Sequence, residues 1–219
     1  MTDTVASIQN LSKVIKGHTI LNDVSLELMS GKIYGIVGRN GSGKSMLFKS
    51  IAGLIKPTSG TIEVFGDKIT SGKFPKDTAI LLDKGGFLPH YSGFKNLQLL
   101  ASINNLIEDA NIKKTLQIVG LDPEDKRTVK KYSLGMTQRL GIAQAIMENP
   151  QLLILDEPMN GLDEEGVQEM YNLILRLKTK GVTILLSSHN SEDIDRLCDI
   201  VYKMDKGSVT QMLAEKVEF

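Results

Sequence analysis

The feature that most constrains this chain is the segment GRNGSGKS at residues 38–45, which holds three glycines and one lysine. It follows the apolar run KIYGIV, which is typical of a buried strand, and precedes SMLFKSIAGLI, which has helical spacing up to Pro57. Because glycine lacks a Cβ atom, the backbone can curl here until several N–H groups point at one anion. A strand, a glycine-rich loop and a helix in this order predict a phosphate-binding loop.

The side chains of this phosphate loop suit a nucleotide bound with magnesium. Lys44 would place a point charge on the β- and γ-phosphates, and the hydroxyl of Ser45 would ligate Mg²⁺. The helix from Ser45 adds the positive end of its dipole. The alternative is a flexible glycine turn with an incidental lysine, a pattern that rarely arises by chance. We expect ATP to contact Gly38, Arg39, Asn40, Gly41, Ser42, Gly43, Lys44 and Ser45.

A second group of candidate residues follows the apolar run LLIL, where the chain reads Asp156-Glu157. A buried strand that ends in two acids delivers both carboxylates to the carboxyl edge of a sheet, where doubly wound folds bind ligands. Asp156 would hold magnesium directly or through water, and Glu157 would orient or deprotonate the attacking water. The alternative is an acidic cap on the next helix.

Composition narrows the partners of the chain. The 219 residues carry 26 basic and 26 acidic side chains, so the net charge is zero and a general attraction to nucleic acid is not expected. The single cysteine, Cys198, cannot form an internal disulfide and is interpreted as a small buried apolar residue. We find no signal peptide and no apolar run of about 20 residues, so we expect a soluble chain that meets a membrane only through a partner.

The order of apolar patterns predicts one α/β domain, 1–219, with a largely parallel sheet. Residues 1–85 combine strands of alternating polarity, expected to be antiparallel, with the phosphate-loop core. Residues 86–149 contain three helical patterns and form a helical insert. Residues 150–219 return to buried strands and helices and end in a hairpin around 205–207.

Five motifs in this order resemble the ATP-binding cassette (ABC) ATPases over essentially the whole chain. GRNGSGKS resembles Walker A, YSLGMTQR at 132–139 the signature motif, LLILDE Walker B, NGLD at 160–163 the D-loop, and LLSSHN the segment that carries the switch histidine, here His189. The resemblance implies a P-loop NTPase cassette with an antiparallel β lobe and a helical insert.

The resemblance also implies that two cassettes pair head to tail around two ATP molecules. Ser133 and Gly135 open a helical pattern whose N-terminus could grip the γ-phosphate bound by the other cassette. The alternative is that Ser133 is only a helix cap. His189 would hydrogen-bond the γ-phosphate, although a lone histidine is more often structural. We expect the second cassette to be an identical chain.

Three positions depart from the family's pattern. Ile15 stands where an aromatic residue usually stacks on adenine, so it offers apolar contact without a π face. Asp83 stands at the place of the Q-loop glutamine, where it could bind Mg²⁺ or be a simple loop residue. Leu134 and Met136 replace the commonest glycine and glutamine of the signature, a variant that often serves exporters.

These features predict an ATPase subunit that powers an exporter of a drug, a peptide or another small molecule. Its partners would be integral membrane subunits, docked near GGFLPHYSGF at 85–94, and it would lie on the inner face of the cell membrane. The alternative is a soluble ABC ATPase that acts on nucleic acid or the ribosome, but the chain has neither a second cassette nor a long coiled coil. A binding module without catalysis is disfavoured because the catalytic side chains are present.

Overall fold

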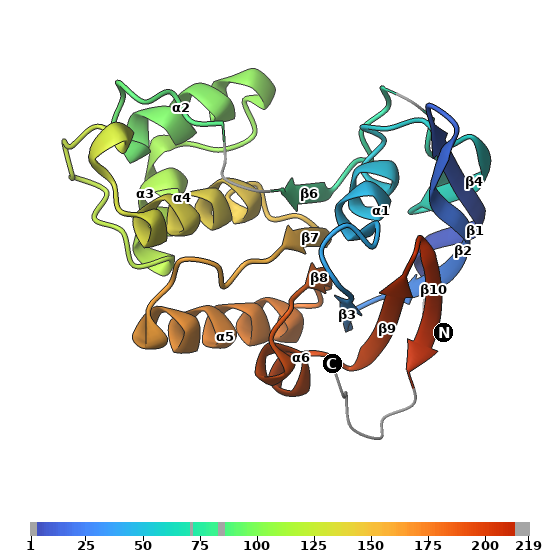
Figure 1. Ribbon diagram of the computed structural model, residues 1–219. Coiled ribbons are helices and arrows are strands. Elements are labelled where there is room, and N and C mark those ends of the chain that lie inside the picture. The colour runs from blue at the N-terminus through green and yellow to red at the C-terminus, as the bar shows by residue number, and fades with distance from the viewer. Residues whose placement is uncertain (1–3, 71, 83–85, 213–219) are drawn as a thin grey trace.

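The computed structural model describes residues 4–70, 72–82 and 86–212. Two sheets and the helices packed on them build the molecule (Figure 1). The smaller sheet has the strand order β2-β1-β4-β5, and its neighbouring strands are antiparallel, as predicted for the start of the chain. Its strands are β1 (Thr4–Ile15), β2 (His18–Met29), β4 (Ser59–Val64) and β5 (Asp67–Lys68).

The larger sheet has the strand order β10-β9-β3-β8-β7-β6. All its strands run parallel except β10, which forms a hairpin with β9, so the predicted parallel sheet and terminal hairpin are confirmed. The strands are β3 (Ile33–Val37), β6 (Thr78–Leu81), β7 (Leu152–Asp156), β8 (Thr183–Ser187), β9 (Ile200–Asp205) and β10 (Ser208–Met212).

Both faces of the larger sheet are covered, which explains why its central strands are apolar throughout. On β3, Ile33 and Val37 pack into the core under the insert helices, whereas Tyr34 and Ile36 pack into the core under the smaller sheet. The carboxyl ends of β3, β7 and β8 therefore meet at one edge between two rigid cores, which is where ligands bind in such sheets.

The helices divide into a core set and an insert. The insert helices α2, α3 and α4 lie at the opposite end of the molecule from the smaller sheet (Figure 1). The core helices are α1 (Lys44–Ile51), α5 (Glu164–Thr179) and α6 (Ser191–Leu197). The insert consists of α2 (Gly93–Asn104), α3 (Asp109–Ile118), a 3₁₀ turn (Val129–Lys131) and α4 (Leu134–Ile146). Within the described residues no helix is both long and apolar enough to span a bilayer.

Two local features differ from the sequence prediction. Helix α1 ends at Ile51, one turn earlier than the proline at 57 suggests, because Gly53 adopts a left-handed φ of 71° and closes the helix. The short strand β6 was not predicted, since four residues at the sheet edge carry too little pattern.

Cys198 packs against the core, and burial raises the pKa of its thiol to about 12, consistent with a packing role.

Candidate nucleotide site

The phosphate loop joins β3 to α1, and at two of its positions the backbone has a conformation that strongly favours glycine. Gly41 and Gly43 have φ values of 81° and 114°, in the region that side chains rarely adopt. At Gly38 the limit is space, because a Cβ atom would lie 2.3 Å from the backbone oxygen of Met204 on β9. The glycines therefore allow the loop to turn tightly while it packs against the sheet.

The loop presents a positive, hydrogen-bonding surface to the cavity above it. Lys44 is only 7% exposed, and its Nζ atom donates to the backbone oxygens of Gly38 at 2.7 Å and Arg39 at 3.4 Å. The buried hydroxyl of Ser42 has no hydrogen-bond partner within the part of the chain that the structure describes. A buried cation and an unpaired hydroxyl at the start of a helix fit a phosphate anion.

Three elements bring hard oxygen atoms together beside the phosphate loop. Ser45 at the start of α1 donates its hydroxyl to Oδ2 of Asp156 on β7 at 2.5 Å. Ser187 on β8 donates to Oδ1 of the same carboxylate at 2.6 Å. A carboxylate and a hydroxyl are ligands that Mg²⁺ accepts, and this ion usually completes its shell with water and substrate phosphates. The donor set therefore fits a magnesium ion bound together with a nucleotide.

Glu157 lies next to these oxygens in an unusual backbone conformation. Its φ of 51° is left-handed, which is a strained region for a residue with a side chain. The backbone N–H of Glu157 donates to the hydroxyl of Ser187 at 3.0 Å, and this hydrogen bond holds Glu157 in that conformation. The Oε2 atom of Glu157 lies 2.8 Å from Nδ1 of His189, which follows β8. The fold thus brings together two residues that are 32 positions apart and were both predicted to be catalytic.

A cavity of about 1100 Å³ opens over this constellation, large enough for a nucleotide. Of the residues predicted to bind the nucleotide or magnesium, or to be catalytic, those that line it are Asn40, Gly41, Ser42, Gly43, Lys44, Ser45, Asp156 and Glu157. Ile20, Met46, Gln138, Asn160 and Gly161 also line it and were not predicted as site residues.

Some predicted residues are outside the lining of this cavity. Ile15 ends β1 and is 39% exposed, whereas Ile20 on β2 is one of the apolar residues that line the cavity. Gly38 and Arg39 lie at the base of the phosphate loop, and His189 reaches the site through Glu157. Asp83 lies outside the described residues, so its proposed metal role stays a prediction.

The signature segment begins helix α4 within reach of the same cavity. Ser133 caps the helix, since its hydroxyl accepts from the N–H of Met136 at 3.1 Å. Gly135 lies in the first turn, where a Cβ atom would be 3.1 Å from the backbone oxygen of Gly161. Leu134 is 47% exposed and lines the cavity. A capped helix start is compatible both with a plain cap and with an anion site for a second cassette.

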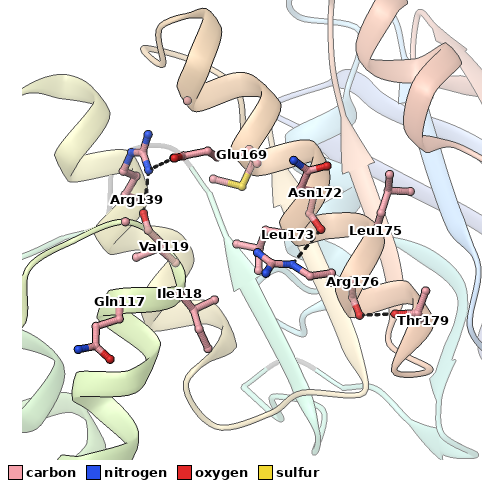
Figure 2. Close-up of a pocket in the computed structure, with 13 residues that line it drawn as sticks. Gln117, Ile118, Val119, Arg139, Glu169, Asn172, Leu173, Leu175, Arg176 and Thr179 are labelled. Atoms are coloured by element: carbon pink, nitrogen blue, oxygen red, sulfur yellow. Dashed lines mark hydrogen bonds and ion pairs between the residues drawn. The ribbon is translucent and has the colours of Figure 1, made fainter.

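A second cavity, of about 590 Å³, lies between α4, α5 and the C-terminal end of α3 (Figure 2). It contains none of the phosphate-loop or acidic site residues. Figure 2 shows Arg139 of α4 reaching both the backbone oxygen of Val119, at 3.0 Å, and the carboxylate of Glu169 on α5, at 2.5 Å. Arg139 therefore ties the helical insert to the core.

Replacing Arg139 with alanine should lower the free energy of unfolding by about 1–3 kcal/mol, because the carbonyl of Val119 and the carboxylate of Glu169 both lose their hydrogen-bond donor. Arg176 in the same cavity is the matched control, since among the residues that the structure describes its Nε atom donates only to the backbone oxygen of Asn172, within its own helix. The R176A change should alter the unfolding free energy by less than about 0.5 kcal/mol. Urea denaturation measures both, and equal effects would show that Arg139 is not a link.

Comparison with known proteins identifies the family. The family model described as ABC transporter matches residues 21–160, which includes the phosphate loop, the signature segment and the two acids. The chain belongs to this family. The ABC cassette hydrolyses ATP to power transport, so the predicted ATPase activity and the predicted P-loop ABC fold are confirmed.

Relatives of this cassette include transport proteins of similar sequence. The ABC transporter ATP-binding protein YybJ of Bacillus subtilis is 43% identical over 91% of this chain and 92% of its own length. The bacitracin transport ATP-binding protein BcrA of Enterococcus faecalis is 38% identical over 94% and 68%. The lantibiotic transport ATP-binding protein SrtF of Streptococcus pyogenes is 38% identical over 92% and 87%. A role on nucleic acid or the ribosome is not favoured by these relatives.

Solved ABC cassettes have the same fold. One described as the ATP-binding subunit of an ABC transporter is 27% identical, with a TM-score of 0.87 and coverage of 96% of this chain and 90% of that one. Another, in its ADP conformation, is 26% identical, with a TM-score of 0.83 and coverage of 95% and 90%. A dimeric cassette bound to ADP and Pi has a TM-score of 0.86 at 20% identity, with coverage of 97% and 100%, and supports the fold alone.

Proposed function

We propose that this chain is the ATP-hydrolysing subunit of a multi-component exporter that carries an antimicrobial peptide, a drug or another small molecule. Relatives named for the transport of bacitracin and of a lantibiotic support the cargo class. The convergence of Lys44, Asp156 and Glu157 around one cavity carries the ATPase assignment.

The site residues divide the work of phosphoryl transfer between them. Lys44 and the backbone N–H groups of the phosphate loop hold the phosphates. Ser45 and Asp156 would hold Mg²⁺, which would neutralise charge on the transferring phosphoryl group. Glu157 orients a water molecule and accepts its proton, while His189 fixes the carboxylate through the contact at 2.8 Å. The adenine base of ATP would contact Ile20 and also Ile15, which lies at the end of β1.

Two anion-binding helix starts in one chain support a head-to-tail homodimer. The start of α1 serves the nucleotide of its own chain, and the start of α4, with Ser133 and Gly135, would serve that of the partner. In this arrangement Leu134, exposed beside the cavity, would be covered by the second chain.

Exposed apolar side chains at the start of the insert support docking on integral membrane subunits. Leu88 and Tyr91 are 48% and 45% exposed, while Phe87 and Phe94 pack against the core. Charged residues are rare in the centres of protein interfaces, and aromatic ones are common. Such docking would hold the chain at the inner face of the cell membrane.

The test is light scattering of the Glu157→Gln variant with and without Mg-ATP. Loss of the base should leave ATP bound and the sandwich closed, so we expect the mass to double when Mg-ATP is added. The Lys44→Ala/Glu157→Gln double variant is the control and should stay monomeric, because it cannot hold the phosphates. A mass that does not change at saturating ATP would contradict autonomous homodimer formation.

A further inference from the structure

Behind His189 lies a buried carboxylate that the chemistry of ATP hydrolysis does not use. Asp193, in the first turn of α6, is 2% exposed. Its Oδ1 atom accepts a hydrogen bond from the phenol of Tyr171 on α5, and its Oδ2 atom accepts one from the hydroxyl of Ser188, both at 2.5 Å. The three side chains form a closed group between α5, α6 and the end of β8.

This arrangement is costly to build, which argues for a role. A buried carboxylate loses its hydration and normally requires a cation or several donors. Arg196, three residues further along α6, pairs with Glu192 and lies over the Tyr171 ring, with 5.4 Å between Cζ and the ring centroid. Desolvation, together with the hydrogen bond to Asp193, raises the pKa of the Tyr171 phenol, which is the direction expected for a buried phenol that donates to a carboxylate.

Hydrogen bonds of Ser187 and of Ser188, a member of the buried group, hold the backbone beside His189. Ser188 donates its hydroxyl to Asp193 and accepts the N–H of Asn190 on the same oxygen at 3.0 Å. The preceding residue, Ser187, is bonded to both Asp156 and the N–H of Glu157. The side chain of His189 is 67% exposed and contacts Glu157, so burial does not hold it in place.

We propose that Asp193, held by Tyr171 and Ser188, is a positioning residue that keeps His189 against Glu157 during ATP hydrolysis. The inference rests on the proposed function for its catalytic consequence, but the positioning itself is a property of the chain. Tyr171 also connects this group to α5, which begins just after Asn160 and Gly161 of the nucleotide cavity. A displacement of α5 would therefore reach His189 through two buried hydrogen bonds, from Tyr171 to Asp193 and from Ser188 to Asp193.

The experiment compares Asp193→Asn and the milder Tyr171→Phe with the wild type. Asp195→Asn is the matched control, since Asp195 is an exposed carboxylate on the same helix. The chain has three histidines, so isotope labelling of histidine gives a small set of ring NMR signals that the His189→Ala variant assigns. Steady-state kinetics of ATP hydrolysis and thermal unfolding are measured on the same variants.

The Glu157→Gln variant, measured alongside, gives the direction in which the His189 ring signals move when the contact with the Glu157 carboxylate changes. We expect D193N and Y171F to move the His189 signals in that same direction, while those of His18 and His90 stay in place. Turnover should fall about 10–100-fold in D193N with KM for ATP within about twofold, as a misplaced catalytic group predicts. D195N should match the wild type. Unmoved His189 signals in both variants, or an equal loss in D195N, would overturn the proposal.

The ATPase activity and the positioning role of Asp193 are tested by separate measurements. If the wild type hydrolyses no ATP, the proposed function is wrong, while the NMR signals of His189 still decide whether Asp193 positions it. If the wild type is active and the His189 signals are the same in D193N and Y171F as in the wild type, the positioning role is wrong and the ATPase assignment stands. Should D193N not fold, Y171F alone decides, because it removes one hydroxyl and leaves the carboxylate bonded to Ser188.

Discussion

Changing Glu157 to glutamine will lower ATP turnover by about 10²–10⁴-fold, the range for loss of a general base. Glutamine has almost the same shape, and the backbone N–H that Ser187 holds is unchanged, so the left-handed turn at this residue should persist. The amide cannot accept a proton from water. The affinity for Mg-ATP should therefore stay within about threefold of the wild type, because the phosphate loop and Asp156 are untouched.

Single-turnover hydrolysis and fluorescent-nucleotide titration measure the two parts of this prediction. Glu165→Gln is the control, since Glu165 is exposed in the first turn of α5 and should leave turnover unchanged. Wild-type turnover in E157Q would mean that another group accepts the proton. A parallel loss of affinity would mean that Glu157 binds the nucleotide rather than the attacking water.

The phosphate loop and the paired acids could be predicted from the sequence because their chemistry is local. Gly41 and Gly43 supply the φ values that the loop needs, and Lys44 stands at a fixed offset from them. Asp156 and Glu157 close an apolar strand, so their place at the sheet edge follows from the strand itself. In each case, neighbouring residues carry the whole pattern.

The remaining contacts could not be predicted because distant segments make them. The hydroxyl of Ser187 meets Asp156 only after β8 pairs with β7, and a serine at the end of a strand has no distinctive pattern. Tyr171 and Asp193 lie 22 residues apart on two helices, where each looks like an ordinary helical residue. Ile20 was missed because an apolar residue on an alternating strand is normally assigned to the core.

The lack of room for a side chain at Gly38 could not be predicted from the sequence for the same reason. Its clash partner, the backbone oxygen of Met204, comes from a strand more than 160 residues later, and only the pairing of β3 with β9 brings the two together. The sequence therefore predicted that glycine is needed in the loop, but not that the sheet itself enforces one of those glycines. Fold-level packing sets this constraint, and local flexibility does not.

Replacing Lys44 with alanine will weaken binding of Mg-ATP and lower turnover together, each by about 10²–10³-fold, as expected when one charged donor to a transferring phosphoryl group is removed. The ammonium group is nearly buried and bonded to the loop carbonyls of Gly38 and Arg39, so it is fixed in place before the nucleotide arrives. Lys44→Arg should not restore binding, because the planar guanidinium is too wide for a site 7% exposed.

Lys49, in the last turn of the same helix, is the matched control, and Lys49→Ala should bind and hydrolyse ATP like the wild type. The comparison with Glu157→Gln is decisive, because Lys44→Ala should lose both affinity for Mg-ATP and turnover, whereas Glu157→Gln should lose turnover alone. Titration with Mg-ATP and thermal unfolding with and without nucleotide measure both. If Lys44→Ala keeps wild-type affinity while folded, the phosphates lie elsewhere in the cavity, and the phosphate loop is not the phosphate-binding site.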